Sequence, residues 1–331
     1  MTESALPATS GNAGYYGLPM LRAPVWGWHV AWYFLLEGIS AGACILSTVA
    51  QLAGDERDAA IVRTGRFVAA AALLPCPALL VADLGRPERF HHMLREFKPS
   101  SPMNTGAWAL TAYSAPVGML ALKEWTGGRR ASALVSRTAR LVPATPLAVA
   151  ALPCALTMIS YPGVLLSTTS TPMWARTRLL GALVACSSMS TGAAAISFVV
   201  AARTPAADRT LGRLQRIEHV ATGAEALALA GYLLSAGKTA EPLTCGRYCR
   251  LFWGGAVAVG LVAATVGRVL SKRNGRHSRP ATMWSAACTI AGAWALKWAL
   301  VHGGRSSAED PTAAQYATQP QLSTPGWRPP A

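Results

Sequence analysis

The chain has 331 residues, of which 52% are hydrophobic and 14% are charged. Soluble domains average about 25% charged residues, so this composition argues against a soluble protein and favours an integral membrane protein. The net charge of +15 does not predict nucleic-acid binding, because the basic residues lie in short clusters between apolar runs and not on one aromatic-rich face.

Apolar stretches follow one another at near-even spacing along the chain. A membrane-spanning helix needs about 20 predominantly apolar residues. Eight stretches meet that requirement: Val25 to Ala53, Val62 to Ala82, Met103 to Leu122, Leu141 to Thr168, Arg178 to Ala202, Ile217 to Ala236, Leu251 to Leu270 and Ala281 to Val301. We therefore expect an all-α, polytopic transmembrane helix bundle of about eight helices.

The bundle is expected to form one domain over residues 25–302. The polar segment 1–24 has no short apolar core typical of a cleavable signal peptide, so the first span would act as its own targeting signal. Residues 303–331 are rich in Pro, Ser, Thr and Gln, which predicts an extended or disordered tail. Lys and Arg are more numerous in the loops that follow odd-numbered spans, which places both termini on the outer side of the membrane.

On the first span, His29, Tyr33 and Glu37 follow one another at intervals of four residues and share one helix face. This stripe descends roughly 12 Å from the outer interface toward the middle of the bilayer. An ionisable group at that depth usually faces a cavity or a partner, so Glu37 is a candidate for proton transfer. The structural alternative is a protonated carboxyl satisfied by a neighbouring helix, and His29 and Tyr33 could be interfacial anchors.

Prolines are concentrated in the second, third and fourth spans, and the fourth is expected to be the most kinked. That span is expected to break at Tyr161-Pro162-Gly163, near the outer surface.

On the sixth span, Glu218 and Glu225 are spaced by seven and lie on one face. Glu225 suits a proton relay or, equally, an interhelical hydrogen bond. Arg268 and Lys297 lie near span ends, where long basic side chains snorkel to the interface.

The loop between the second and third spans differs from an ordinary connector, because it mixes charges with aromatic residues. Its charged residues Asp83, Arg86, Arg89 and Lys98 suit a docking surface for a partner protein, although a solvated loop is an equal alternative.

The sequence argues against haem, because only His29, His219 and His302 touch the spans and His219 lies at the opposite face. The chain also has no tetracysteine motif for an iron–sulfur cluster. No metal site is expected, and the electrons for any redox reaction would come from a partner.

Several motifs together resemble the NrfD/PsrC polysulfide reductase membrane-subunit family. They are Tyr15–Pro19, Trp26–Trp28, the small residues from Gly38 to Gly42, Asp83–Pro87, Phe97–Met103 and Tyr161–Leu166, and they extend from about residue 15 to the tail. The resemblance implies a cofactor-free bundle that exchanges electrons between a membrane quinone and a ferredoxin-like subunit with 4Fe-4S clusters on the outer face. That subunit usually connects to a molybdopterin or multihaem cytochrome subunit.

The resemblance also implies roles for individual residues. Tyr161 matches the family's headgroup-binding tyrosine, and Tyr33, at a position that is histidine in the polysulfide reductase branch, would be the second hydrogen-bond partner. His29 or Glu37 would exchange protons with menaquinone or ubiquinone in a bacterial cytoplasmic membrane. Many relatives carry an acid at the His29 position, a glycine at the Glu37 position and an acid near Thr168, so the proton path differs here.

Two other functions stay open from the sequence. A secondary transporter would show paired interrupted helices in two related halves, whereas the prolines here are concentrated in the second to fourth spans. A passive membrane anchor would tolerate replacement of Glu37 and Tyr161.

Overall fold

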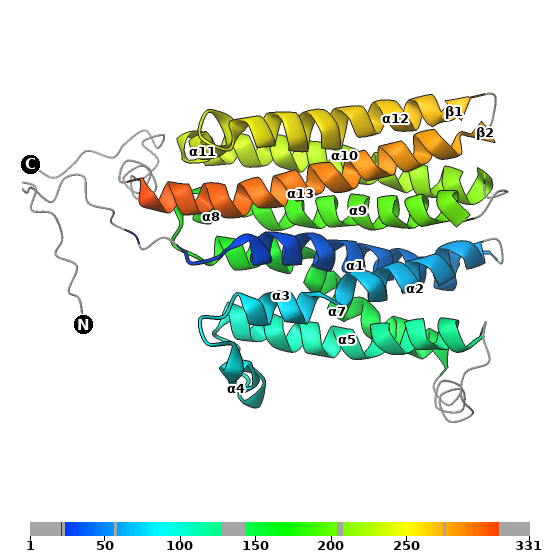
Figure 1. The fold of residues 1–331 in the computed structure, drawn as a ribbon, viewed down its shortest axis with the longest axis horizontal. Coiled ribbons are helices and arrows are strands. Elements are labelled where there is room, and N and C mark those ends of the chain that lie inside the picture. The colour runs from blue at the N-terminus through cyan, green and yellow to red at the C-terminus, as the bar shows by residue number, and fades with distance from the viewer. Residues whose placement is uncertain are drawn as a thin grey trace, which may run out of the picture.

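The computed structural model describes residues 21, 24–55, 58–127, 143–203, 208–273 and 276–310. Within these ranges the chain forms long helices that run side by side as one bundle, which confirms the all-α prediction (Figure 1). The non-helical exception is a short hairpin of two antiparallel strands, β1 (Lys272–Arg273) and β2 (Arg276–His277).

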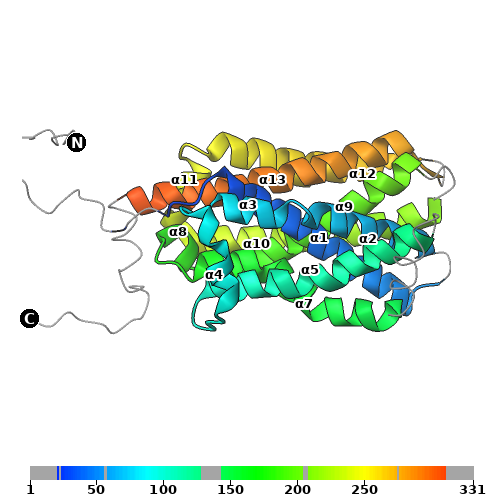
Figure 2. The ribbon, with the colours of Figure 1, turned by 60° about the horizontal axis from the view of Figure 1, so that its bottom comes forward.

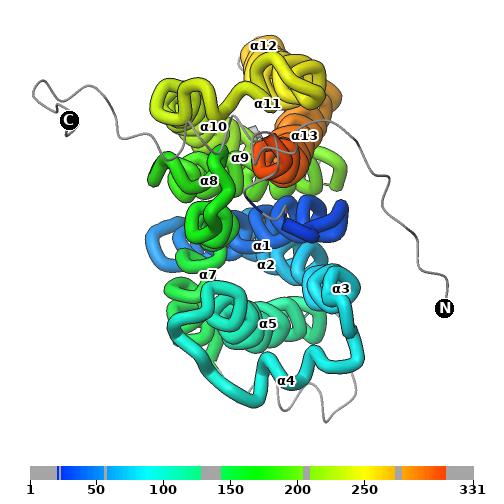
Figure 3. The backbone as a smooth tube through the Cα atoms, turned by 90° about the vertical axis from the view of Figure 1, so that its left-hand side faces the viewer, coloured from blue at the N-terminus to red at the C-terminus, as the bar shows by residue number. Residues whose placement is uncertain are grey.

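The helices gather into two groups when the bundle is seen from one end (Figure 3). The first half contains α1 (Trp28–Ala53), α2 (Ala59–Leu73), α3 (Cys76–Ala82), the 3-10 helix η2 (Pro87–Arg89), α4 (Phe90–Arg95), α5 (Pro102–Gly127) and α7 (Ala144–Ser167). The second half contains α8 (Pro172–Ala175), α9 (Leu179–Arg203), α10 (Asp208–Ala236), the 3-10 helix η3 (Gly237–Ala240), α11 (Glu241–Thr244), the π-helix η4 (Leu251–Ala263), α12 (Ala264–Ser271) and α13 (Arg279–Glu309).

The bundle has two distinct ends. At the α4 end lie α4, α8 and α11, together with the beginning of α1 and the end of α13 (Figures 1 and 2). The strands β1 and β2 lie at the other end, called the hairpin end below (Figure 1). The first and last described helices therefore begin and end on the same side, as an even number of spans requires.

Six helices in the described residues are long and apolar enough to cross a membrane, so the protein is a multi-pass membrane protein. They are Trp28–Ala53, Ala59–Ala82, Ala144–Ser167, Leu179–Arg203, Arg209–Thr244 and Leu251–Ser271. The less apolar α5 and α13 have 26 and 31 residues and run alongside them. Eight spans and outer termini stay predictions.

The prolines act differently from expectation. The second predicted span is divided into α2 and α3 just before Cys76, at Pro75. In contrast, α7 continues through Pro153 and Pro162 to Ser167, so the predicted break at Tyr161–Gly163 is wrong. Each proline removes one backbone donor and leaves the other hydrogen bonds of a long apolar helix in place.

The predicted start of the tail at residue 303 is also wrong, because α13 continues to Glu309. Gly303 and Gly304 lie in this last part of α13, where Gly304 packs against the ring of Trp174. Trp174 is fully buried and donates from Nε1 to the carbonyl of Leu300 at 2.9 Å. This packing holds the end of α13 in the bundle. The expected polar segment 1–24 and the rest of the tail lie almost entirely outside the described residues.

The two halves meet closely where α1 crosses α9. A side chain added at Gly38 would meet Ser188, and one added at Gly42 would meet the α9 backbone at Ser188 and Gly192. Small residues four apart on both helices allow this approach, as in many membrane helix pairs. The small-residue run in the first span is therefore one of the close contacts between the two halves.

Candidate functional site

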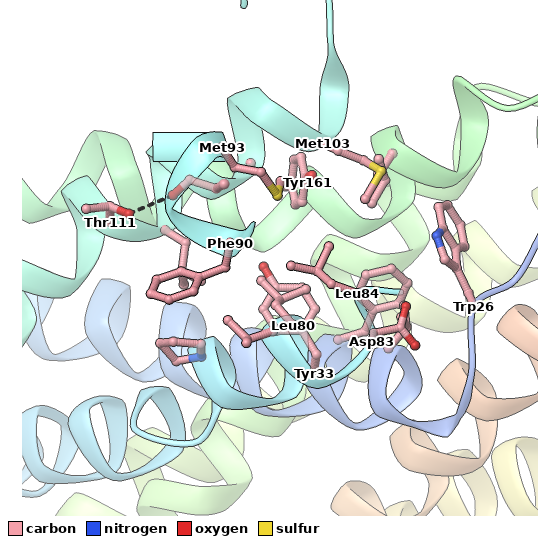
Figure 4. A pocket seen from close by; sticks show the side chains of 18 of the residues that line it. Trp26, Tyr33, Leu80, Asp83, Leu84, Phe90, Met93, Met103, Thr111 and Tyr161 are labelled. Atoms are coloured by element: carbon pink, nitrogen blue, oxygen red, sulfur yellow. Dashed lines mark hydrogen bonds between the residues drawn. The ribbon is translucent and has the colours of Figure 1, made fainter. Parts of the chain in front are cut away.

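A cavity of about 380 Å³ lies at the α4 end of the first half, between α1, α3, α4, α5 and α7 (Figure 4). Its walls are mostly apolar and include the side chains of Trp26, Val30, Phe34, Leu80, Leu84, Phe90, Met93, Met103, Leu110 and Leu165. The polar side chains in its lining are Tyr33, Asp83, Thr111 and Tyr161. A largely apolar pocket with a few convergent polar groups is typical of a small-molecule site.

Tyr161 reaches the cavity from α7. Its hydroxyl donates a hydrogen bond of 3.0 Å to the backbone carbonyl of Pro102, at the start of α5. On the neighbouring helix α5, there is no room for a side chain at Gly106, because a methyl group there would overlap the Tyr161 ring and hydroxyl. The missing side chain at Gly106 therefore makes the space that Tyr161 occupies.

Tyr33 reaches the same cavity from α1, on the wall facing Tyr161 (Figure 4). Its side chain is 1% exposed, and its hydroxyl has no hydrogen-bond partner among the described residues. A buried hydroxyl without a partner costs free energy, so this hydroxyl is available for a bound molecule. The structure thus brings the two predicted tyrosines into one cavity.

Glu37 lies one helical turn beyond Tyr33, deeper in the bundle. It is fully buried, it is not part of the cavity wall, and neither of its carboxyl oxygens has a hydrogen-bond partner in the described part of the chain. Its carboxyl group and the Tyr33 hydroxyl are near neighbours whose geometry falls short of a hydrogen bond, and the carboxyl group also interacts electrostatically with Lys297 of α13. Glu37 is therefore placed behind the cavity, between it and the second half.

Asp83 and His29 form a polar pair beside the cavity. The Asp83 carboxylate accepts a hydrogen bond of 3.2 Å from the backbone N–H of Gly27, and its Oδ1 lies 3.7 Å from Nδ1 of His29. Burial raises the pKa of Asp83, and the Gly27 N–H and His29 oppose that rise. His29 is not part of the wall and stacks on Trp28 with ring centroids 3.9 Å apart, so it contacts the site through Asp83.

The other residues of the predicted docking surface lie outside the cavity. Arg86 directly precedes the exposed helix η2, Arg89 is its last residue, and Lys98 forms an exposed ion pair with Glu96 at 3.3 Å. These three cations lie on the same loop that contributes Leu84 and Phe90 to the cavity. Asp83 belongs to the cavity wall in addition to any docking role.

Glu225 is not near the cavity but lies in the second half, where it accepts a hydrogen bond of 2.9 Å from Ser190 of α9. Lys297 and Arg268 are each 1% exposed, so the expectation that they snorkel to the interface is wrong. Both cations instead interact with buried acids, Lys297 with Glu225 and Arg268 with Glu218. Counting residues from a span end cannot show this, because helices tilt and continue beyond the apolar stretch.

Sequence reasoning also missed most of the apolar wall, including Met93 and Met103. The signal that could have identified it is the set of large apolar residues in the otherwise charged loop before α5. In the structure, α4 folds this loop beside the beginning of α5 (Figure 2), which brings Phe90 and Met93 over the cavity.

Comparison with known proteins agrees with this arrangement. The family model for polysulphide reductase, NrfD, matches residues 19–307 of the sequence. One of the chains of polysulfide reductase from Wolinella succinogenes is 28% identical over 315 residues, which cover 89% of the present protein and 99% of that relative. The match includes every described helix of both halves except the last residues of α13. The chain therefore belongs to the NrfD polysulphide reductase family.

Proposed function

We propose that this protein is the quinone-interacting membrane subunit of a respiratory oxidoreductase complex in a bacterial cytoplasmic membrane. Its relative in Wolinella succinogenes is named as one chain of polysulfide reductase, which supports a role as one subunit among several. The cavity supports the assignment to quinone, because it offers an apolar volume with hydrogen-bonding groups at defined places.

The observation that carries the proposal is the pair of tyrosine hydroxyls in one buried apolar cavity. The two carbonyl oxygens of a quinone accept hydrogen bonds, and a tyrosine hydroxyl donates one. The Tyr33 hydroxyl has no partner among the described residues, and the Tyr161 hydroxyl exchanges the Pro102 carbonyl for the quinone when it binds. The apolar walls suit the ring and the beginning of an isoprenoid tail.

The reaction also needs protons, because reduction of a quinone to a quinol takes up two electrons and two protons. Two titratable pairs lie beside the cavity, namely Tyr33 with Glu37 and Asp83 with His29. Each pair joins a group in the cavity wall to one just outside it. A proton held at Glu37 or His29 thus has a short route to a quinone oxygen, as general acid–base chemistry requires.

The electrons would come from, or go to, a partner subunit. We propose that a ferredoxin-like subunit with 4Fe-4S clusters docks over Arg86, Arg89 and Lys98, and connects to a molybdopterin or multihaem cytochrome subunit. The docking loop also supplies cavity residues, so a cluster held there would lie close to the quinone. In this proposal the membrane subunit itself carries no metal, and menaquinone or ubiquinone is its substrate.

Quinone binding to the purified full-length protein tests the proposal, with a short-tailed menaquinone analogue as the probe. Tyr161→Phe removes one hydrogen bond worth about 1–1.5 kcal/mol, so affinity should fall roughly five- to tenfold. Tyr232→Phe is the matched control, since the Tyr232 hydroxyl also donates to a backbone carbonyl, that of Met173, but lies in the second half. Equal affinity in the wild type and Tyr161→Phe would refute the site, and solute uptake by the protein alone in liposomes would favour a transporter.

A further inference from the structure

We propose that Glu37, Lys297 and Glu225 form a proton relay that connects the quinone cavity with the second half of the bundle. The inference rests on the proposed function and adds Lys297 as its central residue. The relay leads from Tyr33 at the cavity wall through α1, α13 and α10, and it continues toward the hairpin end.

The first step runs from the cavity to Glu37. Tyr33 and Glu37 are one turn apart on α1, both are buried, and the hydroxyl and both carboxyl oxygens have no hydrogen-bond partner among the described residues. A buried carboxyl without partners is costly in any fold and more so inside a membrane. Its position between a cavity and a cation indicates a group that exchanges protons with both.

The second step runs from Glu37 to Lys297. The Lys297 ammonium group is completely buried and donates a hydrogen bond of 3.2 Å to Ser187 on α9. The next residue, Ser188, packs directly against Gly38, the neighbour of Glu37. The tight crossing of α1 and α9 thus brings the ammonium group into electrostatic contact with the Glu37 carboxyl.

The third step runs from Lys297 to Glu225 on α10. Ser190 lies about one turn from Ser187 on α9 and donates to the Glu225 carboxylate at 2.9 Å. The Lys297 ammonium interacts electrostatically with this carboxylate, and its hydrogen-bond partner Ser187 lies beside the same group. Lys297 therefore lies between two buried acids that come from different halves of the bundle.

Charge balance gives this trio a mobile proton. Two carboxyl groups share one ammonium group, and an uncompensated charge is costly where no water is available. The neutral arrangement has one carboxylate, one ammonium and one protonated carboxyl. The extra proton can rest on Glu37 or on Glu225, with Lys297 compensating the charge of the other.

Beyond Glu225 the polar groups continue toward the hairpin end. Two turns away on α10, Glu218 pairs with Arg268 at 3.4 Å, and Arg268 also donates to Thr222 at 3.0 Å. Further along, Gln215 donates to Ser271 and Thr282 at 2.9 and 3.0 Å, beside the β1–β2 hairpin. The relay thus leads away from the end of the bundle where the quinone cavity lies.

The proton transfers balance as follows. When the quinone receives two electrons, Tyr33 gives its hydroxyl proton to a quinone oxygen and regains one from the Glu37 carboxyl. The Glu37 carboxylate then takes a proton from the Lys297 ammonium group. The Glu225 carboxylate takes up a proton from the hairpin end and passes it to the Lys297 amine, which restores the starting arrangement. Two such cycles supply both protons, and oxidation of a quinol runs the same steps in reverse.

Infrared difference spectra of the full-length protein in lipid nanodiscs, recorded while a bound menaquinone analogue is reduced at an electrode, test the relay. We expect a carboxyl signal with two components, one lost in Glu37→Gln and the other lost in Glu225→Gln. Lys297→Met should abolish the Glu225 component and keep the Glu37 component. Glu124→Gln is the control, because Glu124 pairs with Arg66 in the first half and lies outside the trio.

The outcomes separate the two proposals. A wild-type protein that binds no quinone refutes the quinone site, and the relay falls with it. A protein that binds and reduces quinone, but whose carboxyl signal survives in both Glu37→Gln and Glu225→Gln, refutes the relay alone. So does a Glu225 component that persists in Lys297→Met. Thermal unfolding of each variant shows that the spectra come from folded protein, and Lys297→Arg, which keeps the positive charge, provides a second variant if Lys297→Met does not fold.

Discussion

In the first half of the bundle, the Tyr33 hydroxyl and both Glu37 oxygens have no hydrogen-bond partner among the described residues. In the second half, at similar burial, Arg268 pairs with Glu218 and also donates to Thr222, Thr265 and Thr289. Satisfied buried groups rigidify a fold, whereas unsatisfied ones cost free energy and persist where a function needs them. The Arg268–Glu218 cluster is therefore suited to stability and charge compensation, and the Tyr33–Glu37 pair to a ligand, although the Arg268 Nε itself has no partner among the described residues.

The largest expected effect comes from breaking the ion pair between Arg268 and Glu218 in the second half. Arg268→Met leaves the Glu218 carboxylate buried without its cation, which should lower the free energy of unfolding by about 3–5 kcal/mol. Thermal or denaturant unfolding of the purified protein in detergent measures this loss. Adding Glu218→Gln to Arg268→Met should recover much of it, and a double variant as unstable as the single one would show that the charge is not the cause.

The next effect comes from filling the space beside Tyr161. Gly106→Ala forces the Tyr161 ring away from its position, at a strain typical of overpacking, about 1–3 kcal/mol. Affinity for a menaquinone analogue should fall roughly tenfold or more. Gly118→Ala, on the same helix α5 with open space around it, should leave the affinity unchanged. Equal losses in the two variants would point to a general effect on α5.

Tyr33→Phe tests the first half of the comparison, because it should weaken quinone binding without lowering the stability of the protein. Removing a buried hydroxyl that has no partner should leave the free energy of unfolding unchanged or raise it slightly, whereas quinone affinity should fall about fivefold, equivalent to about 1 kcal/mol. Unfolding and quinone titration of the same preparation measure both quantities. A clear loss of stability would mean that the hydroxyl has a structural partner after all.

The smallest effect concerns pH. Burial raises the pKa of Asp83 in the folded protein, so the folded state holds this proton more tightly than the unfolded state does. The contribution of Asp83 to stability is therefore present at acidic pH and is lost as pH rises through its raised pKa. The melting temperature of Asp83→Asn should not show this fall, and the Asn side chain keeps an acceptor for the Gly27 N–H. If the melting temperatures of the wild type and of Asp83→Asn showed the same dependence on pH, another group would be responsible for the effect.

Much of the fold could be predicted from the sequence, because a membrane helix has to satisfy its own backbone and needs a known length of apolar residues. Each of the eight predicted stretches corresponds to a long helix or to a pair of consecutive helical segments. Boundaries were less accurate: α10 begins at Asp208 and α13 continues to Glu309, where charged or small residues extend the helix beyond the apolar run.

The candidate site was only partly predictable. The spacing of Tyr33 and Glu37 gave their shared face and their depth, and a resemblance to relatives, not spacing, paired Tyr33 with Tyr161. The electrostatic interaction between Glu37 and Lys297 had no local signal, because 260 residues separate them and a third helix, α9, packs against both. Lys297 looked like an interfacial residue because sequence position does not show which way a helix faces.

The place of Glu37 in the first helix has a consequence for biosynthesis. Chains grow at roughly 5–20 residues per second, so Lys297 is synthesised on the order of 10–50 s after Glu37. If α1 enters the membrane as it is made, its acid waits for that time without the cation that later compensates it. A newly inserted α1 would then carry Glu37 as a neutral acid or remain beside the insertion machinery, and the arrival of α13 would be the event that completes the assembly.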